Sequence, residues 1–156
     1  MTMRDAISPN VDFAQLAAVS GDAIVVADAD GTITYWNAAA ERTFGFSSAE
    51  ALGQSLDLIT PDRHRRRHWD GYHKTMRSGH TKYGHDVLRV PALTKDGHAL
   101  SIAFTVALLR GADGAVTAIV AIVRDETKRW NEDREIRRRL AELEANAAKA
   151  LAQVST

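Results

Sequence analysis

The chain has 156 residues, in which 20 Lys and Arg balance 20 Asp and Glu, and it contains no Cys. Zero net charge gives no global argument for binding nucleic acid or an anionic membrane, and the absence of Cys excludes disulfides, thiolate zinc sites, cysteine nucleophiles and a flavin bonded to a thiol. No apolar run reaches the roughly 18 residues of a membrane span, and the N-terminus lacks the apolar core of a signal peptide. We therefore expect a cytoplasmic chain with one domain and an appendage.

A short helix and a hairpin are predicted near the N-terminus. Residues 11–19 carry apolar side chains at helical spacing and predict an amphipathic helix that packs on a neighbour or on a dimer partner. Residues 23–27 and 32–36 are strand-like runs that flank Asp30 and Gly31. An Asp-Gly pair between two such runs is a strong hairpin signal, because Gly accepts the positive φ of the turn.

Several short helices are predicted to follow the hairpin. Asn37 precedes an Ala-rich run that ends at Gly45, which fits an N-cap and a helix terminator. Residues 47–50 resemble a capping box at the start of another short helix. The segment 61–79, PDRHRRRHWDGYHKTMRSG, holds three of the six His residues and predicts a longer helix with its proline in the first turn.

Three strand-like segments make up the second half of the domain. Residues 87–93 precede an Asp-Gly turn at 96–97, and residues 98–109 alternate apolar with small or polar side chains, which is the period of a strand. A further Asp-Gly turn precedes an apolar strand at 116–123. Two strands, several short helices and three antiparallel strands predict an α+β sheet with the helices gathered on one side.

The C-terminal segment is strongly charged and is predicted to be helical. It carries apolar residues in steps of four and three, the spacing of a coiled-coil seam. The seam consists of Ile136, Leu140, Leu143, Ala147, Ala150 and Val154. Because two of these positions are Ala, the coil is weak alone. We expect a dimer contact, with a helix packed back on its own domain as the alternative.

Taken together, these residues resemble the PAS sensory-domain family. The resemblance is carried by GDAIVVADADGTITYWNAAAERTFGFSSAEALGQ, by KDG before a long strand, and by GAVTAIVAIVRDET. It implies a five-stranded antiparallel sheet with helices cupped over one face, often enclosing a small ligand. Residues 21–127 would be the PAS domain, 1–20 an N-terminal extension with a short helix, and 128–156 a signalling and dimerisation helix. Glu126 departs from the Asp-Ile-Thr trio that commonly joins core to linker in the family.

His68 is the candidate ligand-binding residue. The segment resembles that of haem-binding oxygen-sensor PAS domains, in which an apolar pair and a proline precede the helix and the iron-ligating His lies seven residues after that proline. In this chain Leu58 and Ile59 precede Thr60 and Pro61, and His68 is seven residues beyond the proline. Neutral imidazole on a helix that faces an apolar pocket is a standard axial ligand of haem iron. The resemblance therefore implies haem b on His68 and the sensing of a diatomic gas.

The same resemblance assigns further residues to the cofactor site. Lys74 falls where the sensors place an arginine near a haem propionate, and Tyr72 lies four residues after His68, where the sensors have a Tyr after three. His85 replaces the distal arginine of the sensors and could donate a hydrogen bond to bound oxygen or serve as a sixth ligand. Alternate residues of the long strand would face the pocket, although a solid core fits the pattern equally well. These residues are Ile102, Phe104 and Val106.

Three other interpretations of the histidine segment stay open. In the first, His68 and Trp69 only pack or hydrogen-bond within the fold. In the second, His64 and His68 bind a metal as an i, i+4 pair, but HRRRH lacks the Glu base of HExxH and its arginines would repel a cation. In the third, an arginine cluster forms a nucleic-acid patch, which zero net charge and the lack of a helix-turn-helix signal disfavour. The cluster consists of Arg63, Arg65, Arg66 and Arg67.

The sequence thus predicts a homodimeric PAS sensor module, joined through its terminal helices, with no catalytic residues, no nucleic-acid partner and no membrane partner. The alternative to a haem sensor is a dimerisation or protein-interaction module that has no cofactor or binds a small organic ligand, including a flavin without a covalent link. The downstream output partner is left unknown.

Overall fold

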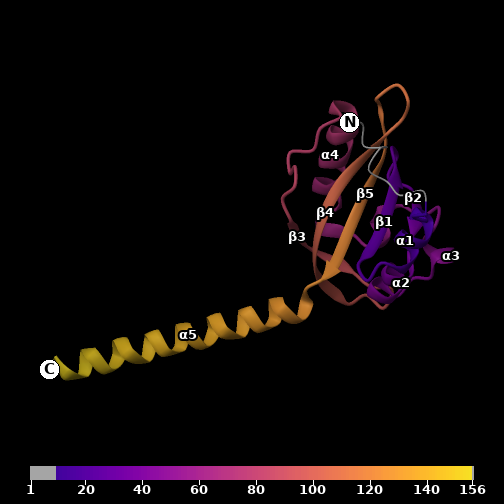
Figure 1. Ribbon diagram of the computed structural model, residues 1–156. Coiled ribbons are helices and arrows are strands. Elements are labelled where there is room, and N and C mark those ends of the chain that lie inside the picture. Colours follow the sequence, from indigo (N-terminus) through magenta and orange to yellow (C-terminus); the bar gives the residue numbers. More distant parts are fainter. Residues whose placement is uncertain (1–9, 156) are drawn as a thin grey trace. The chain divides into compact units, whose positions relative to one another are not determined.

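The computed structural model describes residues 10–155, and the chain divides into two compact units between Asp125 and Glu126. Residues 1–9 of the predicted N-terminal extension lie outside the described residues. The first unit contains a five-stranded sheet in the order β2-β1-β5-β4-β3, in which every neighbouring pair is antiparallel (Figure 1). Its strands are β1 (Ala23–Asp28), β2 (Ile33–Trp36), β3 (Leu88–Leu93), β4 (Ala99–Arg110) and β5 (Val116–Asp125). The predicted α+β fold with a five-stranded antiparallel sheet is confirmed.

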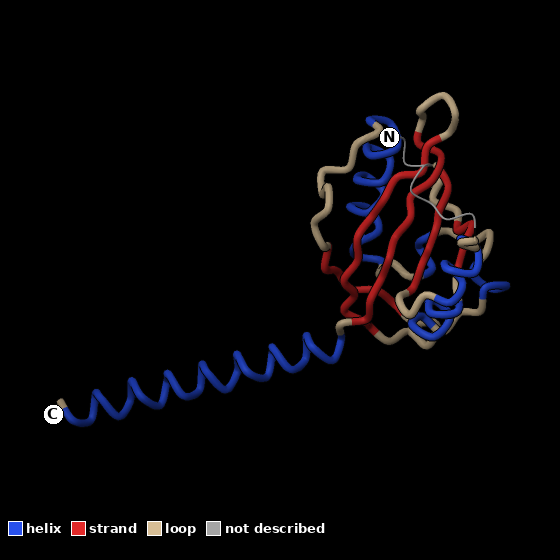
Figure 2. The backbone as a smooth tube through the Cα atoms, in the orientation of Figure 1, coloured by secondary structure: helices blue, strands red, loops and turns tan. Residues whose placement is uncertain are grey.

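All the helices of the first unit except the first one lie between β2 and β3. They are α1 (Phe13–Val19), α2 (Ala38–Phe44), α3 (Ser48–Ala51), the 3-10 helix η2 (Leu56–Leu58) and α4 (Asp62–Ser78). In the view of Figure 1, α4 runs behind β3 and β4, and the same arrangement is seen in Figure 2. The histidine segment is therefore a single helix beside the sheet, as its sequence predicts.

The predicted helix caps are present. The side chain of Ser47 accepts a hydrogen bond from the backbone N–H of Glu50, and the Glu50 carboxylate accepts one from the N–H of Ser47. This reciprocal pair satisfies two backbone donors at the start of α3. At the end of α2, Gly45 adopts the left-handed conformation that closes a helix.

Asn37 joins three elements through its side-chain amide. Its Oδ1 accepts hydrogen bonds from the backbone N–H of Ile24 in β1 and of Ala40 in α2, both at 2.9 Å. Its Nδ2 donates to the carbonyls of Ala17 in α1, at 3.0 Å, and of Asp22, at 3.1 Å. Since the residue is only 3% exposed, these bonds form in a shielded environment where each matters more than at the surface.

One face of the sheet carries the hydrophobic core. In β1 the buried side chains alternate with partly exposed ones, and the buried ones are Ala23, Val25 and Ala27. Trp36 of β2 and Phe44 of α2 pack on this side with their ring centroids 5.3 Å apart. The indole nitrogen of Trp36 donates a hydrogen bond to the carbonyl of Phe46 at 3.0 Å, so its polar atom is satisfied.

The register of the strands places part of β4 on the same face. Val106 lies opposite Ala121 of β5, which lies opposite Val25 of β1. Because residues directly opposite each other point to the same side of a sheet, Val106 and its alternate neighbours Ile102 and Phe104 belong to the core face. Ile102 is buried, whereas Phe104 and Val106 are only half-buried.

The second unit consists of α5 (Thr127–Val154), a helix of 28 residues with no buried side chain. Its charged and apolar residues are therefore all accessible within this unit. Across residues 10–155, no helix combines the length and the apolar character needed to cross a membrane.

Candidate functional site

The face of α4 that carries His68 is turned toward the body of the first unit. Along this helix, half-buried or buried residues recur at intervals of three and four positions, the repeat of one helix face. They include His64, Arg65, His68, Trp69, Tyr72 and Met76. Because solvent reaches this side poorly, its polar atoms need partners within the protein or in a ligand.

Trp69 holds this face of α4 to two other segments. Its indole Nε1 donates a hydrogen bond to the carboxylate of Asp57 in η2 at 2.8 Å. Its ring also lies against Gly31, in the turn between β1 and β2, where an added Cβ would come within 2.1 Å of the ring. The large side chain next to His68 therefore packs against the β1–β2 hairpin, in the space left by the missing side chain of Gly31.

Tyr72 makes a second connection between α4 and the hairpin. Only 7% of the residue is exposed, and its hydroxyl donates a hydrogen bond to the carbonyl of Asp28 at the end of β1. Burial raises the pKa of this hydroxyl well above its usual value, and the charges of Asp28 and Asp30 act in the same direction. The hydroxyl therefore stays protonated, and its proton is engaged with the backbone.

His68 lies between these two aromatic residues on the inward face. The centroid of its ring is 4.8 Å from that of Trp69, edge to face, and 5.8 Å from that of Tyr72. Its Nδ1 is buried and has no hydrogen-bond partner among the residues that the structure describes. A neutral imidazole with an unengaged nitrogen is able to bind a metal ion or to hydrogen-bond a ligand.

The charge state of His68 follows from its surroundings. Burial lowers the pKa of the imidazole below its ordinary value, because the charged form loses hydration. The carboxylate of Asp57 acts in the opposite direction, and His73 adds to the lowering. The ring is therefore neutral at pH 7, which is the form that ligates iron.

Asp57 is a residue of this site that no sequence pattern singles out. Its carboxylate accepts the hydrogen bond of the Trp69 indole and also forms an ion pair with the guanidinium of Arg65, at 3.7 Å. Arg65 also donates to the backbone carbonyls of Asp57 and Thr60, both at 3.1 Å. These bonds fix the first turns of α4 to η2. The partners come from different elements, so their sequence spacing carries no signal that would have identified Asp57.

Two other polar side chains of α4, those of Lys74 and His64, stand apart from this arrangement. Lys74 is exposed, so it could meet a propionate only at the solvent edge of the helix. His64 is half-buried, and its Nε2 accepts a hydrogen bond from Nε of Arg63 at 3.1 Å. Within residues 10–155, no group of three or more His, Cys, Asp or Glu is placed to hold a metal ion. The interpretation of His64 and His68 as a metal-binding pair therefore gains no support.

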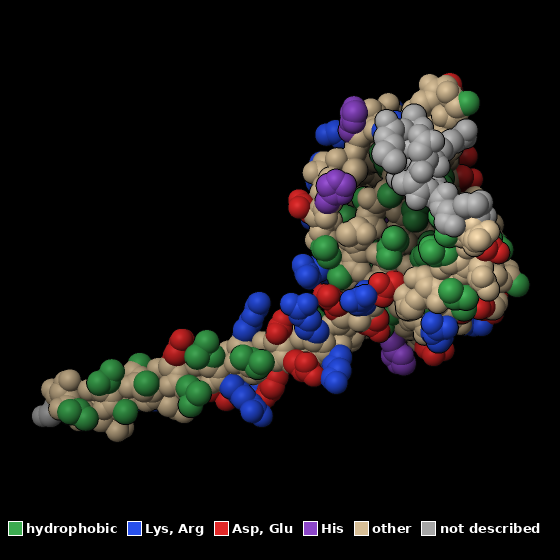
Figure 3. Space-filling view, in the orientation of Figure 1, with side chains coloured by type: hydrophobic (Ala, Val, Ile, Leu, Met, Phe, Trp, Pro, Cys, Tyr) green, Lys and Arg blue, Asp and Glu red, His purple; other side chains and the backbone are tan. Residues whose placement is uncertain are grey.

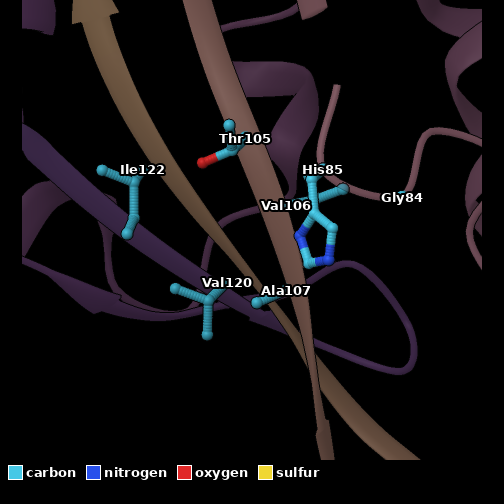
Figure 4. Close-up of a pocket in the computed structure, with 7 residues that line it drawn as sticks. All are labelled: Gly84, His85, Thr105, Val106, Ala107, Val120 and Ile122. Carbon is cyan, nitrogen blue, oxygen red and sulfur yellow. The ribbon is translucent and has the colours of Figure 1, made fainter. Parts of the chain in front are cut away.

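His85 lines a separate hollow of about 220 Å³ on the sheet (Figure 4). The hollow is lined by Gly84, His85, Thr105, Val106, Ala107, Val120 and Ile122. Thr105 and Ala107 alternate with Phe104 along β4 and therefore belong to the face opposite the core. Val106, in contrast, belongs to the core face, so the hollow is lined by residues of both faces of β4. The structure thus groups His85 with Val106 of the predicted site, but His68 does not line this hollow.

Known proteins resemble this chain over parts of its length. A family model described as the PAS fold matches residues 12–125. The sensor protein FixL of Bradyrhizobium diazoefficiens is 45% identical over 51 residues, which cover 33% of this chain and 10% of that protein. An uncharacterised protein of Azorhizobium caulinodans is 30% identical over 118 residues, or 75% of this chain and 16% of that protein. The chain therefore spans only a small part of either relative.

Solved structures give the same fold. The crystal structure of a PAS domain from Colwellia psychrerythraea is 26% identical, with a TM-score of 0.66 over 74% of this chain and 95% of that one. An RNA-binding light-oxygen-voltage receptor has a TM-score of 0.66 at 23% identity, over 86% of this chain and 40% of that one. At that identity the likeness to the receptor concerns the fold alone.

Proposed function

Because the chain belongs to the PAS family, we propose that it is a sensor module that binds haem b through His68 and relays the state of the haem to its C-terminal helix. Membership of the family rests on the match over residues 12–125. The choice of His68 rests on one observation: its Nδ1 is buried and lacks a hydrogen-bond partner among residues 10–155.

A buried polar atom without a partner is costly, by about 1–3 kcal/mol in proteins generally. A group that the polypeptide does not supply would remove that cost, and the neutral imidazole suits iron. When bound, haem would supply an iron that is able to bind a diatomic gas. Trp69 and Tyr72 would hold the helix that carries the ligand, since both are anchored outside it by hydrogen bonds.

The apolar surface of the core face supports the same proposal. Phe104 and Val106 are half-buried although they lie on the face that carries the core. Apolar side chains that keep some exposure beside a buried core leave surface for an apolar ligand to cover. Lys74, at the exposed side of α4, would reach a propionate that extends to solvent.

Absorption spectra of the protein reconstituted with hemin test this assignment. We expect a Soret band of similar intensity for the wild type and for His64→Ala, one helical turn away, and a lost or shifted band for His68→Ala. Circular dichroism checks that both variants fold. If the wild type gives no band, haem is wrong; if the His68→Ala band is identical, His68 is not the ligand.

The relay is proposed to run through a homodimer that includes α5. The apolar residues of its seam are exposed within the second unit; Ile136 is 64% and Leu143 66% exposed. Burying such side chains against a second helix is favourable. Output would pass from the paired helices to a partner not contained in this chain. A monomeric mass in light scattering at tens of micromolar would remove the homodimer from the proposal.

A second candidate is an interaction module that has no cofactor or binds a small organic ligand, including a flavin held without a covalent bond. The hydrogen bonds of Trp69 to Asp57 and of Tyr72 to Asp28 favour it, because they fix α4 with groups of the polypeptide alone. A dimer that shows no Soret band with hemin would support this candidate over the haem sensor. Neither candidate includes catalysis.

A further inference from the structure

The exposed side of α4 carries a stripe of charge that is mainly positive. Positions 63, 67, 70, 74 and 77 are separated by four, three, four and three residues, so they lie along one side of the helix, opposite the buried Tyr72. The residues at these positions, all exposed, are Arg63, Arg67, Asp70, Lys74 and Arg77, and they form the α4 stripe. At 1.5 Å per residue the stripe is about 21 Å long.

Positive charge is concentrated in this helix. The 17 residues of α4 include six Lys or Arg and two Asp, a net charge of +4, whereas the 156 residues together carry none. Like charges three or four residues apart weaken a helix. The stability of α4 therefore gives no reason for the stripe.

The cations of the α4 stripe are unpaired. Within residues 10–155, the only cation of α4 that forms ion pairs is Arg65, with Asp57 and Asp62, and Arg65 lies outside the stripe. In α5, by contrast, Arg138 is paired with two Glu residues of its own helix. Basic and acidic side chains are interspersed along the first half of α5 in the space-filling view (Figure 3). Mixed signs are typical of a helix face that meets only solvent, so the α4 stripe offers positive charge to a partner.

Gly71 gives a second, independent indication of a partner. It is exposed beside the stripe in the middle of α4, where Gly makes a helix less stable than Ala does. Its φ is not positive, and among the described residues an added Cβ would meet nothing within 4 Å beyond the backbone of α4 itself. The fold of the chain therefore does not require a glycine here. The missing side chain lets the backbone of another molecule approach closely.

The chemistry of the stripe favours an acidic protein over other anionic partners. Asp70 at its centre would repel a nucleic acid, whose backbone carries only negative charge. Trp69 and Tyr72 are turned inward by their hydrogen bonds, so neither lies on the stripe to stack on a base. A membrane surface is bound by helices that insert apolar side chains, and no large hydrophobic side chain of α4 is exposed.

We propose that the α4 stripe binds an acidic α-helix of another protein, which passes over Gly71. The matching helix carries acidic residues at the same four-and-three spacing and a Lys or Arg at its centre, opposite Asp70. A second helix fits because two packed helices contact each other through residues spaced by three and four. The inference does not depend on the proposed function, since it uses neither His68 nor the seam of α5.

Nuclear magnetic resonance titration of the full chain with a synthetic helix tests the proposal. The matching peptide is an Ala-rich helix with Glu at the four positions that face cations and Lys at the centre. A scrambled peptide has the same composition with its charges spread around the helix. We expect the amide signals of α4 to shift, with a dissociation constant at least about fivefold lower for the matching peptide. Equal affinity for both peptides, or no shift in α4 up to about 2 mM, would overturn the proposal.

Charge reversal locates the contact on the stripe. Arg67→Glu should weaken binding of the matching peptide about fivefold, because an attractive contact becomes repulsive. Arg42→Glu is the matched control, since it reverses an exposed cation of another helix, α2, and should leave the affinity unchanged. Equal weakening in the two variants would show attraction by charge alone and overturn the site. Lys74 is left unchanged, because the proposed haem site also uses it.

Asp70→Lys tests the order of charges along the stripe. The variant should bind the matching peptide more weakly and should prefer a peptide with Glu in place of its central Lys. Tighter binding of both peptides would show that only the total charge counts, and would overturn the pairing at Asp70.

Gly71→Ala separates binding from stability. The substitution should raise the urea midpoint, because Ala is the better helix former, yet weaken binding of the matching peptide about fivefold, because the methyl group holds the two helices apart. A loss of binding in a more stable protein cannot come from unfolding. Unchanged affinity would overturn the placement of the partner over Gly71.

Two further measurements identify a different occupant. If DNA of about 20 nucleotides binds more tightly than the matching peptide and loses affinity in Arg67→Glu, the stripe is a nucleic-acid site and the proposal is wrong. If Arg67→Glu alone lowers the mass in sedimentation, a second copy of this chain occupies the stripe, which also overturns it. None of these results bears on haem, because the Soret band of the His68 variants is measured independently.

Discussion

The ring of Trp69 occupies the space that a side chain at Gly31 would need. A Cβ built on Gly31 would lie 2.1 Å from Cη2 and 2.2 Å from Cζ3 of the indole. The backbone of Gly31 also has φ of 80°, a conformation that side-chain-bearing residues rarely adopt. The contact between α4 and the β1–β2 turn therefore depends on a glycine for two independent reasons.

Substitution of Gly31 by Ala should lower the free energy of unfolding by about 2–4 kcal/mol, since backbone strain and displacement of the indole act together. Gly114→Ala is a matched control, because Gly114 also has φ of 80° but has no atom within 4 Å of an added Cβ. We expect it to cost about 1 kcal/mol. Urea unfolding monitored by circular dichroism gives both values.

The contribution of the ring can be isolated in a Trp69→Ala background. There the cost of Gly31→Ala should fall to that of Gly114→Ala, because only the backbone conformation remains to be strained. An unchanged cost would mean that the indole does not restrict the turn, and that the anchoring of α4 at Gly31 is weaker than the geometry indicates.

Residues whose role is set by nearby sequence were predictable. The Asp-Gly turns, the cap at Asn37 and the box at Ser47 and Glu50 obey rules that act over a few positions, so the strands and short helices could be placed before the fold was known. The four-residue spacing of His64 and His68 likewise predicts that they share one helix face, and both are half-buried in α4.

Residues whose role is set by distant partners were not predictable. Asp57 meets Trp69 only because η2 and α4 fold together, and Tyr72 reaches a carbonyl 44 positions away. His85 lies in a loop without periodicity, so no pattern shows which face of the sheet it will join. The neighbours of His68, and therefore its chemistry, needed the three-dimensional structure.

Asn37→Ala should destabilise the first unit by about 3 kcal/mol. The substitution removes the acceptor of two backbone N–H groups and the donor of two carbonyls in a site that is 3% exposed. Asp12→Ala is the control, because its side chain accepts one exposed hydrogen bond at the start of α1, so it should cost 1 kcal/mol at most, about the value of an N-cap. Similar losses for the two variants would contradict the role of Asn37 as a joint between elements.

The stability of the protein without haem should fall as the pH drops below about 6.5. Burial lowers the pKa of folded His68 below the ordinary value of 6.5, so between these two values the unfolded chain binds more protons. The stability that the protein gains from keeping His68 neutral is fully present above pH 6.5 and is lost on acidification. The free energy of unfolding then changes by at most about 1.4 kcal/mol per pH unit. His68→Gln should flatten this part of the profile in urea titrations, whereas the exposed His98→Gln should leave it unchanged. If the pH dependence of the free energy of unfolding is the same in His68→Gln as in the wild type, the loss of stability arises from other titratable groups.

Arg110 ties the C-terminal end of α4 to the β4–β5 turn. Its Nη2 donates to the carbonyl of Gly79, the residue that caps α4, at 2.5 Å, and its Nη1 donates to the carbonyl of Gly114 at 3.1 Å. Arg110→Met should therefore speed amide hydrogen exchange in the last turn of α4 about fivefold, with less than about 1 kcal/mol lost in global stability, because these bonds are exposed and local.

The comparison with Arg77→Met separates hydrogen bonding from charge at this helix end. Arg77 is an exposed cation in the same last turn, where positive charge interacts favourably with the helix dipole. If the bonds of Arg110 hold the turn, Arg77→Met should change exchange much less than Arg110→Met. Equal acceleration in the two variants would show that any cation suffices at this position. In that case the contacts of α4 with Asp57, Asp28 and Gly31 would be the main ones that hold the helix, and His68 with it, in place.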